Sequence, residues 1–340
     1  MMNLEDFLEN YSNVGMNPYI VLNDNDSLPT ETSTKELQVL DIKSPAVEKF
    51  IKGYNLQKNP FKEYTGYLIL LSKNSQSAVQ TCFLTSQSGF KQNVKNVVIV
   101  EDNSELSIFT GCLSSTHVKS NIHNAVTDIF VGRNSIVTFN MIHSWGETSK
   151  VFPKLKVYVD EGGVFMSNYV VWEKVQEISS NPEIFVKKGG KAVIQSLVYS
   201  HPGSSLNVGG KVFLKGGGSR GEILSSVISK GGNYKTITEI IGNGDKAKGH
   251  IECNAVLLGD DGKVETVPLL KAGNSTVQLS HEASIGKISK EEIQYLQTKG
   301  LNKDRARELI VKGFVNDSIK EMPSSIQEKI EDIMSNSQGF

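Results

Sequence analysis

The sequence has almost no excess charge and no long apolar run, and each absence removes a class of protein. Its 36 basic and 37 acidic residues give a formal net charge of -1. The chain therefore lacks the excess of positive charge that is typical of a nucleic-acid binder. No apolar stretch reaches the about 18 residues that span a bilayer. The N-terminus, MMNLEDFLENYSN, is acidic where a secretory signal would be basic and then apolar. We therefore expect a cytoplasmic protein with no membrane insertion and no nucleic-acid partner.

Cysteine is also scarce, since Cys82, Cys112 and Cys253 are the three present in the whole chain. They are too few and too far apart for a disulfide framework or a CxxC metal knuckle. At least one thiol is therefore expected to be free.

Two signatures of enzymes are missing as well. There is no GxxxxGK[ST] phosphate loop, and the GGK runs at residues 189–191 and 209–211 follow turn positions instead of leading a strand into a helix. A polysaccharide-cleaving protein would need two carboxylates about 5 to 9 Å apart on one face. The nearest cluster is Asp260, Asp261 and Glu265, in the turn GDDGKVE, where acidic residues are common as solvated turn formers.

The sequence does contain a repeat of about 28 residues, which combines short Val-, Ile- and Phe-rich stretches of alternating polarity with a Gly, Asn or Asp turn. Units begin at Val98, Ile129, Val157, Ile184, Val212, Ile240 and Leu269, so successive starts differ by 31, 28, 27, 28, 28 and 29. Helical repeats need a 3.6-residue period and tolerate little glycine. The pattern predicts a mainly β protein, a parallel β-solenoid in which each strand pairs with its equivalents about 4.8 Å above and below.

The open ends of such a stack are unpaired strand edges that need cover. We divide the chain into an N-terminal helical or irregular cap at 1–65, a solenoid core at 66–287 and a C-terminal helical domain at 288–340. Within the first part, EDFLENY and SPAVEKFIKGY are expected to form short helices.

The C-terminal helices have clear start and stop signals. Ser289 with Glu292 forms a capping box for a first helix, which is expected to end at Gly300. A second helix, KDRARELIVKGF, is expected to end near Gly313, and a third to begin at Ser325.

Cys253, His281 and Glu282 are the most informative candidate site. His281 follows Cys253 by one full repeat, so we expect the thiol and the imidazole on adjacent coils of the same sheet. Thiolate, imidazole and carboxylate are all iron ligands. The alternative is that Cys253 packs inward as a small apolar residue and His281 satisfies a strand end.

The stretch from Ile251 to Val315 resembles the C-terminal half of the SufB and SufD family of iron-sulfur cluster assembly proteins. It contains C-x-x-x-x-L-x-G, then HEAS, then a helical hairpin that ends in I-V-x-G-F. Upstream, FTGCLSSTHVKSNIHNAVTDIFVGRNSIVTFNMIHSW resembles the SufB segment in which a Gly-Cys pair precedes a His-Ala-Ala-Val strand and a tryptophan. The resemblance covers roughly residues 95 to 320.

The resemblance implies a right-handed parallel β-helix with helical flanks, which dimerises through the β-helix and binds the soluble ABC-type ATPase SufC through its C-terminal helices. It also implies that Cys112 accepts sulfur from a cysteine desulfurase or a sulfur carrier and passes it through the β-helix interior. Cys253 and Glu282 would build the nascent cluster, and His281 would match a SufD histidine that acts with them. Because both SufB cysteines have counterparts, the chain is SufB-like.

Some positions depart from the family pattern. The C-D-S of the family is Cys253-Asn254-Ala255 here, and a glutamine of the sulfur-transfer tunnel is replaced by His143, near Trp145. Cys82 matches no family cysteine and is interpreted as an ordinary buried thiol.

His117 and His123 fall in a segment that we interpret as a solvated loop. Metal binding by either histidine is the less favoured alternative.

Our hypothesis is a homodimeric, SufC-dependent scaffold that carries a transient iron-sulfur cluster and is not itself an enzyme. In it, one gene product would do the work that SufB and SufD divide elsewhere. The alternatives are a carbohydrate-active β-helix enzyme and a structural subunit of an ABC-type complex.

Overall fold

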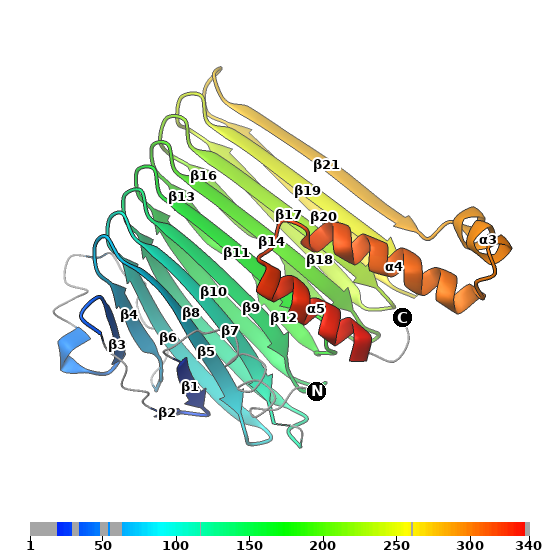
Figure 1. The fold of residues 1–340 in the computed structure, drawn as a ribbon, viewed down its shortest axis with the longest axis horizontal. Coiled ribbons are helices and arrows are strands. Elements are labelled where there is room, and N and C mark those ends of the chain that lie inside the picture. Colours follow the sequence, from blue (N-terminus) through cyan, green and yellow to red (C-terminus); the bar gives the residue numbers. More distant parts are fainter. Residues whose placement is uncertain are drawn as a thin grey trace.

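The alternating segments form strands that stack into a parallel β-solenoid, and the described residues that follow it form helices (Figure 1). This computed structural model describes residues 19–28, 34–47, 54, 63–115, 117–259 and 261–336. The predicted mainly β class is confirmed. The coils contribute strands to two sheets, which we call sheet 1 and sheet 2, and two coils contribute a pair of short strands to sheet 2, β12 with β13 and β15 with β16. Side chains between the sheets fill the interior.

Sheet 1 consists, in spatial order, of β2 (Asp26–Leu28), β1 (Tyr19–Asn23), β5 (Gln76–Thr85), β7 (Glu105–Ser114), β9 (Ile136–Ser144), β11 (Val164–Val171), β14 (Lys191–Ser200), β17 (Arg220–Ser229), β19 (Lys248–Leu257) and β21 (Gln278–Lys287). Sheet 2 consists of β3 (Leu37–Asp41), β4 (Tyr67–Leu71), β6 (Phe90–Val100), β8 (Asn121–Val131), β10 (Lys150–Val159), β13 (Glu183–Val186), β16 (Gly210–Leu214), β18 (Asn233–Gly242), β15 (Ser205–Val208) and β12 (Glu177–Ser180), and β20 (Lys263–Ala272) pairs with β18.

The repeat positions stack as the sequence predicted, with one slip. Val98 pairs with Ile129, which pairs with Val157, and the line continues through Ile184, Val212 and Ile240. The last coil is one residue out of step, because Ile240 pairs with Leu270 and not with Leu269. Leu269 instead lies on the outer face and is 40% exposed.

In successive coils, the turn that leads from the sheet 2 strand to the sheet 1 strand contains a residue with a left-handed backbone. Asn74, Asn103 and Asn134 have φ values of 59°, 56° and 53°, and Gly162 and Gly189 continue the line at 66°. Asparagine and glycine tolerate this conformation better than other residues. The asparagines also form a ladder, in which Nδ2 of Asn103 donates to Oδ1 of Asn74 at 3.3 Å and Nδ2 of Asn134 to Oδ1 of Asn103 at 3.4 Å.

The N-terminal end of the stack is covered by strands, which differs from the predicted helical cap. β1 pairs in parallel with β5, and β3 pairs antiparallel with β4, so both edges of the first coil have partners. Strand pairing satisfies the edge N–H and C=O groups that a helix would leave unpaired. Residues 45–47 are helical, while EDFLENY and most of SPAVEKFIKGY lie outside the described residues.

The C-terminal helices are α3 (Lys290–Thr298), α4 (Lys303–Ile319) and α5 (Ser324–Asn336). The side chain of Ser289 accepts a hydrogen bond from the Glu292 backbone N–H at 2.9 Å, which confirms the predicted cap. The predicted end at Gly313 is wrong, because α4 continues to Ile319. Val315 and Ile319 are buried against sheet 1, and this burial outweighs the glycine penalty of about 1 kcal/mol.

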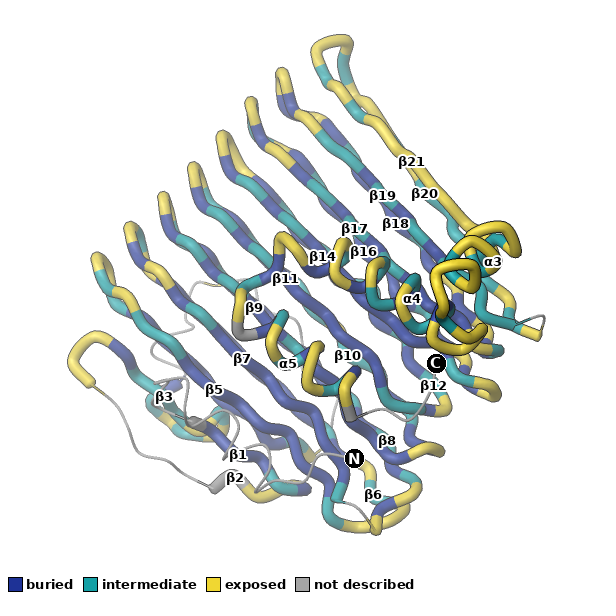
Figure 2. The backbone as a smooth tube through the Cα atoms, turned by 45° about the vertical axis from the view of Figure 1, so that its right-hand side comes forward, coloured by how far each residue is buried: buried dark blue, intermediate teal, exposed yellow. Residues whose placement is uncertain are grey.

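α4 and α5 pack across the outer face of sheet 1 and do not cover the open end of the stack (Figure 1). β20 and β21 therefore form the last edges of their sheets within the described residues. Figure 2 shows the consequence, since the middle strands are buried while β21 is exposed along its length. Among the described residues, no helix combines the length and the apolar character needed to cross a membrane.

Candidate functional site

Cys112 lies on β7 with its thiol in the solenoid interior, and it is 1% exposed. Its register neighbours are Phe83 on one side and His143 on the other. Burial raises the pKa of the Cys112 thiol well above its ordinary value. The resting thiol is therefore protonated, and a reaction at this sulfur requires a nearby base or an opening of the coil.

His143 lies beside Cys112 as a neutral imidazole. The indole Nε1–H of Trp145 donates to its Nδ1 at 2.8 Å, and burial lowers the pKa of His143 to about 3. The proton of the neutral ring is then on Nε2, which has no hydrogen-bond partner among the described residues. This N–H is a free donor in a buried place, and a small anion would satisfy it.

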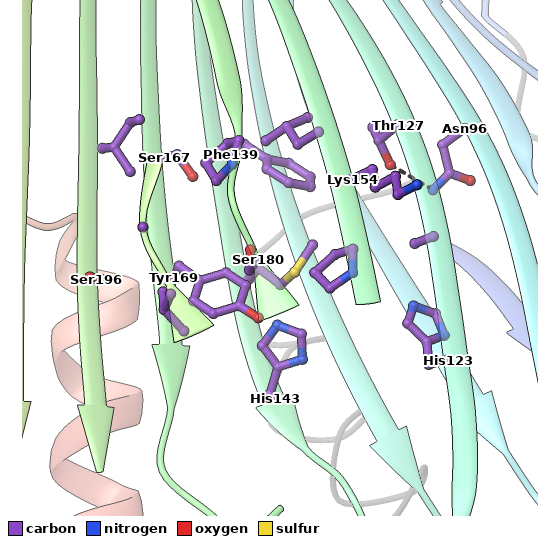
Figure 3. Close-up of a pocket in the computed structure, with 18 of the residues that line it drawn as sticks. Asn96, His123, Thr127, Phe139, His143, Lys154, Ser167, Tyr169, Ser180 and Ser196 are labelled. Carbon is purple, nitrogen blue, oxygen red and sulfur yellow. Dashed lines mark hydrogen bonds between the residues drawn. The ribbon is translucent and has the colours of Figure 1, made fainter. Parts of the chain in front are cut away.

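An interior cavity of about 40 Å³ opens beside this ring. Its lining includes His123, Met141, His143, Tyr169, Ser196 and Val208. Figure 3 shows the rings of His143 and Tyr169 close together, with His123 farther along, and the centroids of the first two are 4.6 Å apart. The cavity has space for a few small atoms, so it can hold sulfide or water but no organic substrate.

His123 was predicted in a solvated loop, and this prediction is wrong. It lies on β8 inside the solenoid, 2% exposed, and its Nδ1 is 2.7 Å from Oε1 of Gln92. Burial lowers its pKa to about 3. The alternation in Asn121–Val131 places position 123 on the inward face. His117 is exposed, and its Nε2 lies 2.9 Å from the Ser86 carbonyl oxygen.

A row of polar side chains connects the cavity to Cys253. The inward positions in register along sheet 1 are Thr81, Thr110, Met141, Tyr169, Ser196, Ser225 and Cys253. Cys112 and His143 belong to the next row, two residues along each strand. We call Tyr169, Ser196, Ser225 and the adjoining Tyr234 the hydroxyl row. The hydroxyl row was not predicted from the sequence, although a hydroxyl at the same inward position of successive repeats is a usable signal.

Tyr234 joins the hydroxyl row from sheet 2. Its hydroxyl lies 3.0 Å from Ser225 Oγ and donates to the Val208 carbonyl at 3.2 Å. Burial raises the pKa of Tyr234 to about 12, so the phenol is neutral and can donate. Cys253 is the next residue of the row after Ser225.

Cys253 is 1% exposed, although it lies on β19, one strand from the open end. Burial raises the pKa of its thiol. Five strand steps separate β7 from β19, which is about 24 Å at about 4.8 Å per step. Cys112 and Cys253 therefore cannot bind the same ion.

His281 is on the adjacent coil as predicted, but the register is shifted. It pairs with Ile251, while Cys253 pairs with Ala283, because the last coil is longer than the repeat predicts. A strand spacing of about 4.8 Å and a rise of about 3.3 Å per residue place the Cα atoms of Cys253 and His281 about 8 Å apart. Both side chains face inward, and His281 is exposed at the open end.

Glu282 is not brought together with Cys253. It pairs with Glu252, and side chains of successive residues point to opposite faces of a strand. Its carboxylate therefore lies on the outer face, where Oε1 is 3.4 Å from His250 Nε2. The three predicted residues are thus divided by the sheet, with Cys253 and His281 inside and Glu282 outside.

The remaining candidates have structural positions. Cys82 is buried on the outer side of β5 among Val21 and Leu84. The carboxylate of Glu265 forms a salt bridge with Lys235 at 2.9 Å, as expected of a solvated surface group, and Asp260 lies outside the described residues. Gly189 forms a turn with φ of 66°, in agreement with the absence of a phosphate loop.

Comparison with known proteins finds a family model and relatives that this chain is similar to. Residues 83–314 match the family model described as SUF system FeS cluster assembly, SufBD core domain. An iron-sulfur cluster assembly SufBD family protein of Archaeoglobus fulgidus is 36% identical over 322 residues, covering 90% of this chain and 86% of that protein. SufBD family proteins of Methanothermobacter thermautotrophicus strain Delta H and Pyrococcus horikoshii are each 32% identical, covering 78% and 74% of this chain but 65% and 57% of their own lengths.

Proposed function

This chain belongs to the SufBD family of iron-sulfur cluster assembly proteins, and from that premise we propose that it is the scaffold on which a transient cluster is built. Cys112 receives sulfur, the interior conducts it, and Cys253 holds the nascent cluster near the open end. The observation that supports this most is the hydroxyl row, which lines the interior between two buried cysteines. The protein itself catalyses no hydrolysis, and ATP is consumed by a soluble SufC-type partner in the cytoplasm.

Sulfur moves along the row as a small species, because none of the side chains between Cys112 and Cys253 in the two rows carries a thiol. Release of sulfide from a Cys112 persulfide needs two electrons and two protons, which an external dithiol supplies while it becomes a disulfide. The N–H of His143, which has no partner among the described residues, is a donor that stabilises such an anion away from water. The Ser225 hydroxyl, which donates to Tyr234 while Tyr234 donates to Val208, can rotate its proton toward the anion.

Separate lesions at the two cysteines test this function. Cys253→Ala is expected to keep sulfur loading by a cysteine desulfurase but to lose the cluster formed anaerobically from iron and free sulfide. Cys112→Ala is expected to keep the sulfide reaction and to lose the desulfurase-driven one. Cys82→Ala is the matched control, since it removes an equally buried thiol outside the interior.

Absorption and Mössbauer spectra measure the cluster, and ³⁵S transfer measures the loading. If Cys112→Ala and Cys253→Ala fail identically in the sulfide reaction while both stay folded, the two-site proposal is wrong.

We propose that α3 and α4 dock on the ATPase. No residue of α3 is buried, and its Tyr295 is 61% exposed. Leu309 on α4 is 51% exposed, and large apolar side chains exposed in this way mark an interaction surface. Tyr295→Glu and Leu309→Glu should each abolish co-purification with SufC, whereas Asn316→Glu, also exposed on α4, should not. Retained binding in both first variants would show that another surface docks the partner.

We also propose that a second copy of the chain covers the open end. The inward residue Ile285 is 44% exposed there, and β21 has a free edge within the described residues. This contact would bring the two Cys253 coils together and add ligands from both protomers. Light scattering is expected to show a dimer that Ile285→Glu dissociates and Thr276→Glu does not. A wild-type monomer, alone and with the ATPase, would contradict it.

A further inference from the structure

His250, Glu252 and Glu282 form a cluster on the outer face of sheet 1, where one donor atom from each lies within 4.8 Å of the others. The register produces this cluster, because Glu252 pairs with Glu282 and His250 pairs with Ser280 on the neighbouring strand. His250 Nε2 and Glu282 Oε1 are 3.4 Å apart. That separation is about the edge of a tetrahedron whose metal–ligand bonds measure about 2.1 Å.

The two glutamates differ from the other glutamates in the strands from β12 to β21 in lacking a salt bridge to lysine or arginine. On neighbouring coils the outward glutamates that each form a salt bridge with a lysine are Glu177, Glu183, Glu222, Glu239 and Glu265. Among the described residues, neither Glu252 nor Glu282 has such a partner within 4 Å. Lys320 interacts with Glu252 only through space and forms its salt bridge with Asp317 at 2.9 Å.

This arrangement leaves two carboxylates facing each other. Like charges directly opposite on paired strands repel each other. The pair of Glu252 and Glu282 is therefore a place where a cation removes an existing repulsion.

Hydrogen bonds hold two of the three donors in position. Asn254 Nδ2 donates to Oε1 of Glu252 at 2.6 Å, and His250 Nδ1 lies 2.9 Å from Ser280 Oγ. A partner on Nδ1 leaves Nε2 to bind a metal, and partners of this kind orient ligands in metal sites. A groove lined by His250, Ser280 and Gly249 gives solvent access beside the cluster.

The ligand chemistry selects the class of ion. One imidazole and two carboxylates suit divalent first-row metals such as Mn²⁺, Fe²⁺ and Zn²⁺, and they disfavour Cu⁺, which prefers sulfur ligands. Three protein ligands leave coordination positions open for water or for transfer of the ion. Glu252 immediately precedes Cys253 in the chain, but the thiol faces the interior, so the sheet separates it from this cluster.

We propose that His250, Glu252 and Glu282 bind a divalent iron ion on the outer face of β19 and β21, separately from the sulfur-handling interior. The choice of iron rests on the proposed function, whereas the existence of the site does not. Glu282 thus acts with His250 and Glu252, and Cys253 is not a ligand of the same ion. Iron would be bound on the outer face of β19, the strand whose inner face carries the Cys253 thiol.

The test is metal binding to the full-length apo-protein without sulfur, ATP or partner. Binding of Mn²⁺ is followed by the loss of the free-ion EPR signal, and binding of Fe²⁺ by anaerobic equilibrium dialysis. We expect one ion per chain. Glu252→Gln and Glu282→Gln, which preserve side-chain size, should each weaken binding at least about tenfold, and Asn254→Ala should weaken it by about tenfold through the orientation of Glu252.

Two controls make the result specific. Glu265→Gln removes an outward glutamate that is already paired with Lys235, and Cys82→Ala removes a buried thiol far from the cluster, so both should bind metal as the wild type does. Wild-type affinity in the Glu252→Gln/Glu282→Gln double variant would overturn the proposal. If metal binds as expected and no cluster ever forms, the scaffold function fails while this site stands.

Discussion

Acidification should destabilise the coils that contain His123 and His143. Burial lowers the pKa of each imidazole to about 3, far below the ordinary value of 6.5. Between these values the unfolded chain binds protons that the folded chain does not, so stability is fully present above pH 6.5 and is lost as the pH falls toward 3. The cause is the absence of water around two rings that are each 2% exposed.

The size of the effect follows from the shift. A buried imidazole of this kind costs about 1.4 kcal/mol of stability per pH unit below 6.5. At pH 5 each ring accounts for about 2 kcal/mol, and His123 with His143 for about 4 kcal/mol. This is a large part of the total stability of a folded domain, which is usually on the order of 10 kcal/mol.

Urea unfolding at pH 7, 6 and 5 measures the loss, and Trp145 is a local probe, since its ring centroid is 4.9 Å from that of His123. The His123→Gln/His143→Gln double variant should lose most of the pH dependence, because glutamine keeps hydrogen-bonding groups without titrating. His117→Gln, at an exposed histidine, should behave as the wild type. An equal fall of stability in the double variant and the wild type would refute the reasoning.

Three further substitutions give separate outcomes. Ser225→Ala should lower the free energy of unfolding by about 1 kcal/mol, a modest loss because Tyr234 keeps its hydrogen bond to Val208. The variant should also slow desulfurase-driven assembly without affecting the reaction with free sulfide, and equal rates from both sulfur sources would exclude a role for this hydroxyl. Gly313→Ala should stabilise the protein by about 0.5 to 1 kcal/mol in thermal unfolding, since an added Cβ meets nothing within 4 Å. Val315→Ala should cost about 2 kcal/mol by the same measurement, because the side chain is fully buried against sheet 1, and an unchanged melting temperature would mean that α4 does not pack there in solution.

Local sequence patterns were enough to predict much of the fold. The segments that begin at Val98 and Ile129 could be aligned from alternation and turn residues alone, and they stack in that register. Side chains alternate across a strand, and left-handed turns favour Asn and Gly. Both signals therefore depend on a few neighbouring residues and can be recognised in short stretches of sequence. The cap at Ser289 is equally local, because its hydrogen bond joins neighbouring positions of one helical turn.

Interactions between distant segments decided the rest. α4 continues past Gly313 because Val315 and Ile319 find an apolar sheet face, and no window of the helix sequence contains that face. The strand cover at the N-terminal end has the same origin, since β1 is paired with β5, which lies far along the chain.

The candidate site shows the same division most clearly. The residue types at Cys253, His281 and Glu282 pointed to metal and sulfur chemistry, and spacing placed them on adjacent coils. The register between β19 and β21, set by the turns that join them through β20, then decided which faces they share. Because a strand reverses side-chain direction at every residue, Glu282 joins His250 and Glu252 outside while Cys253 stays within. Sidedness of this kind depends on how two coils pair, and only the tertiary structure determines that pairing.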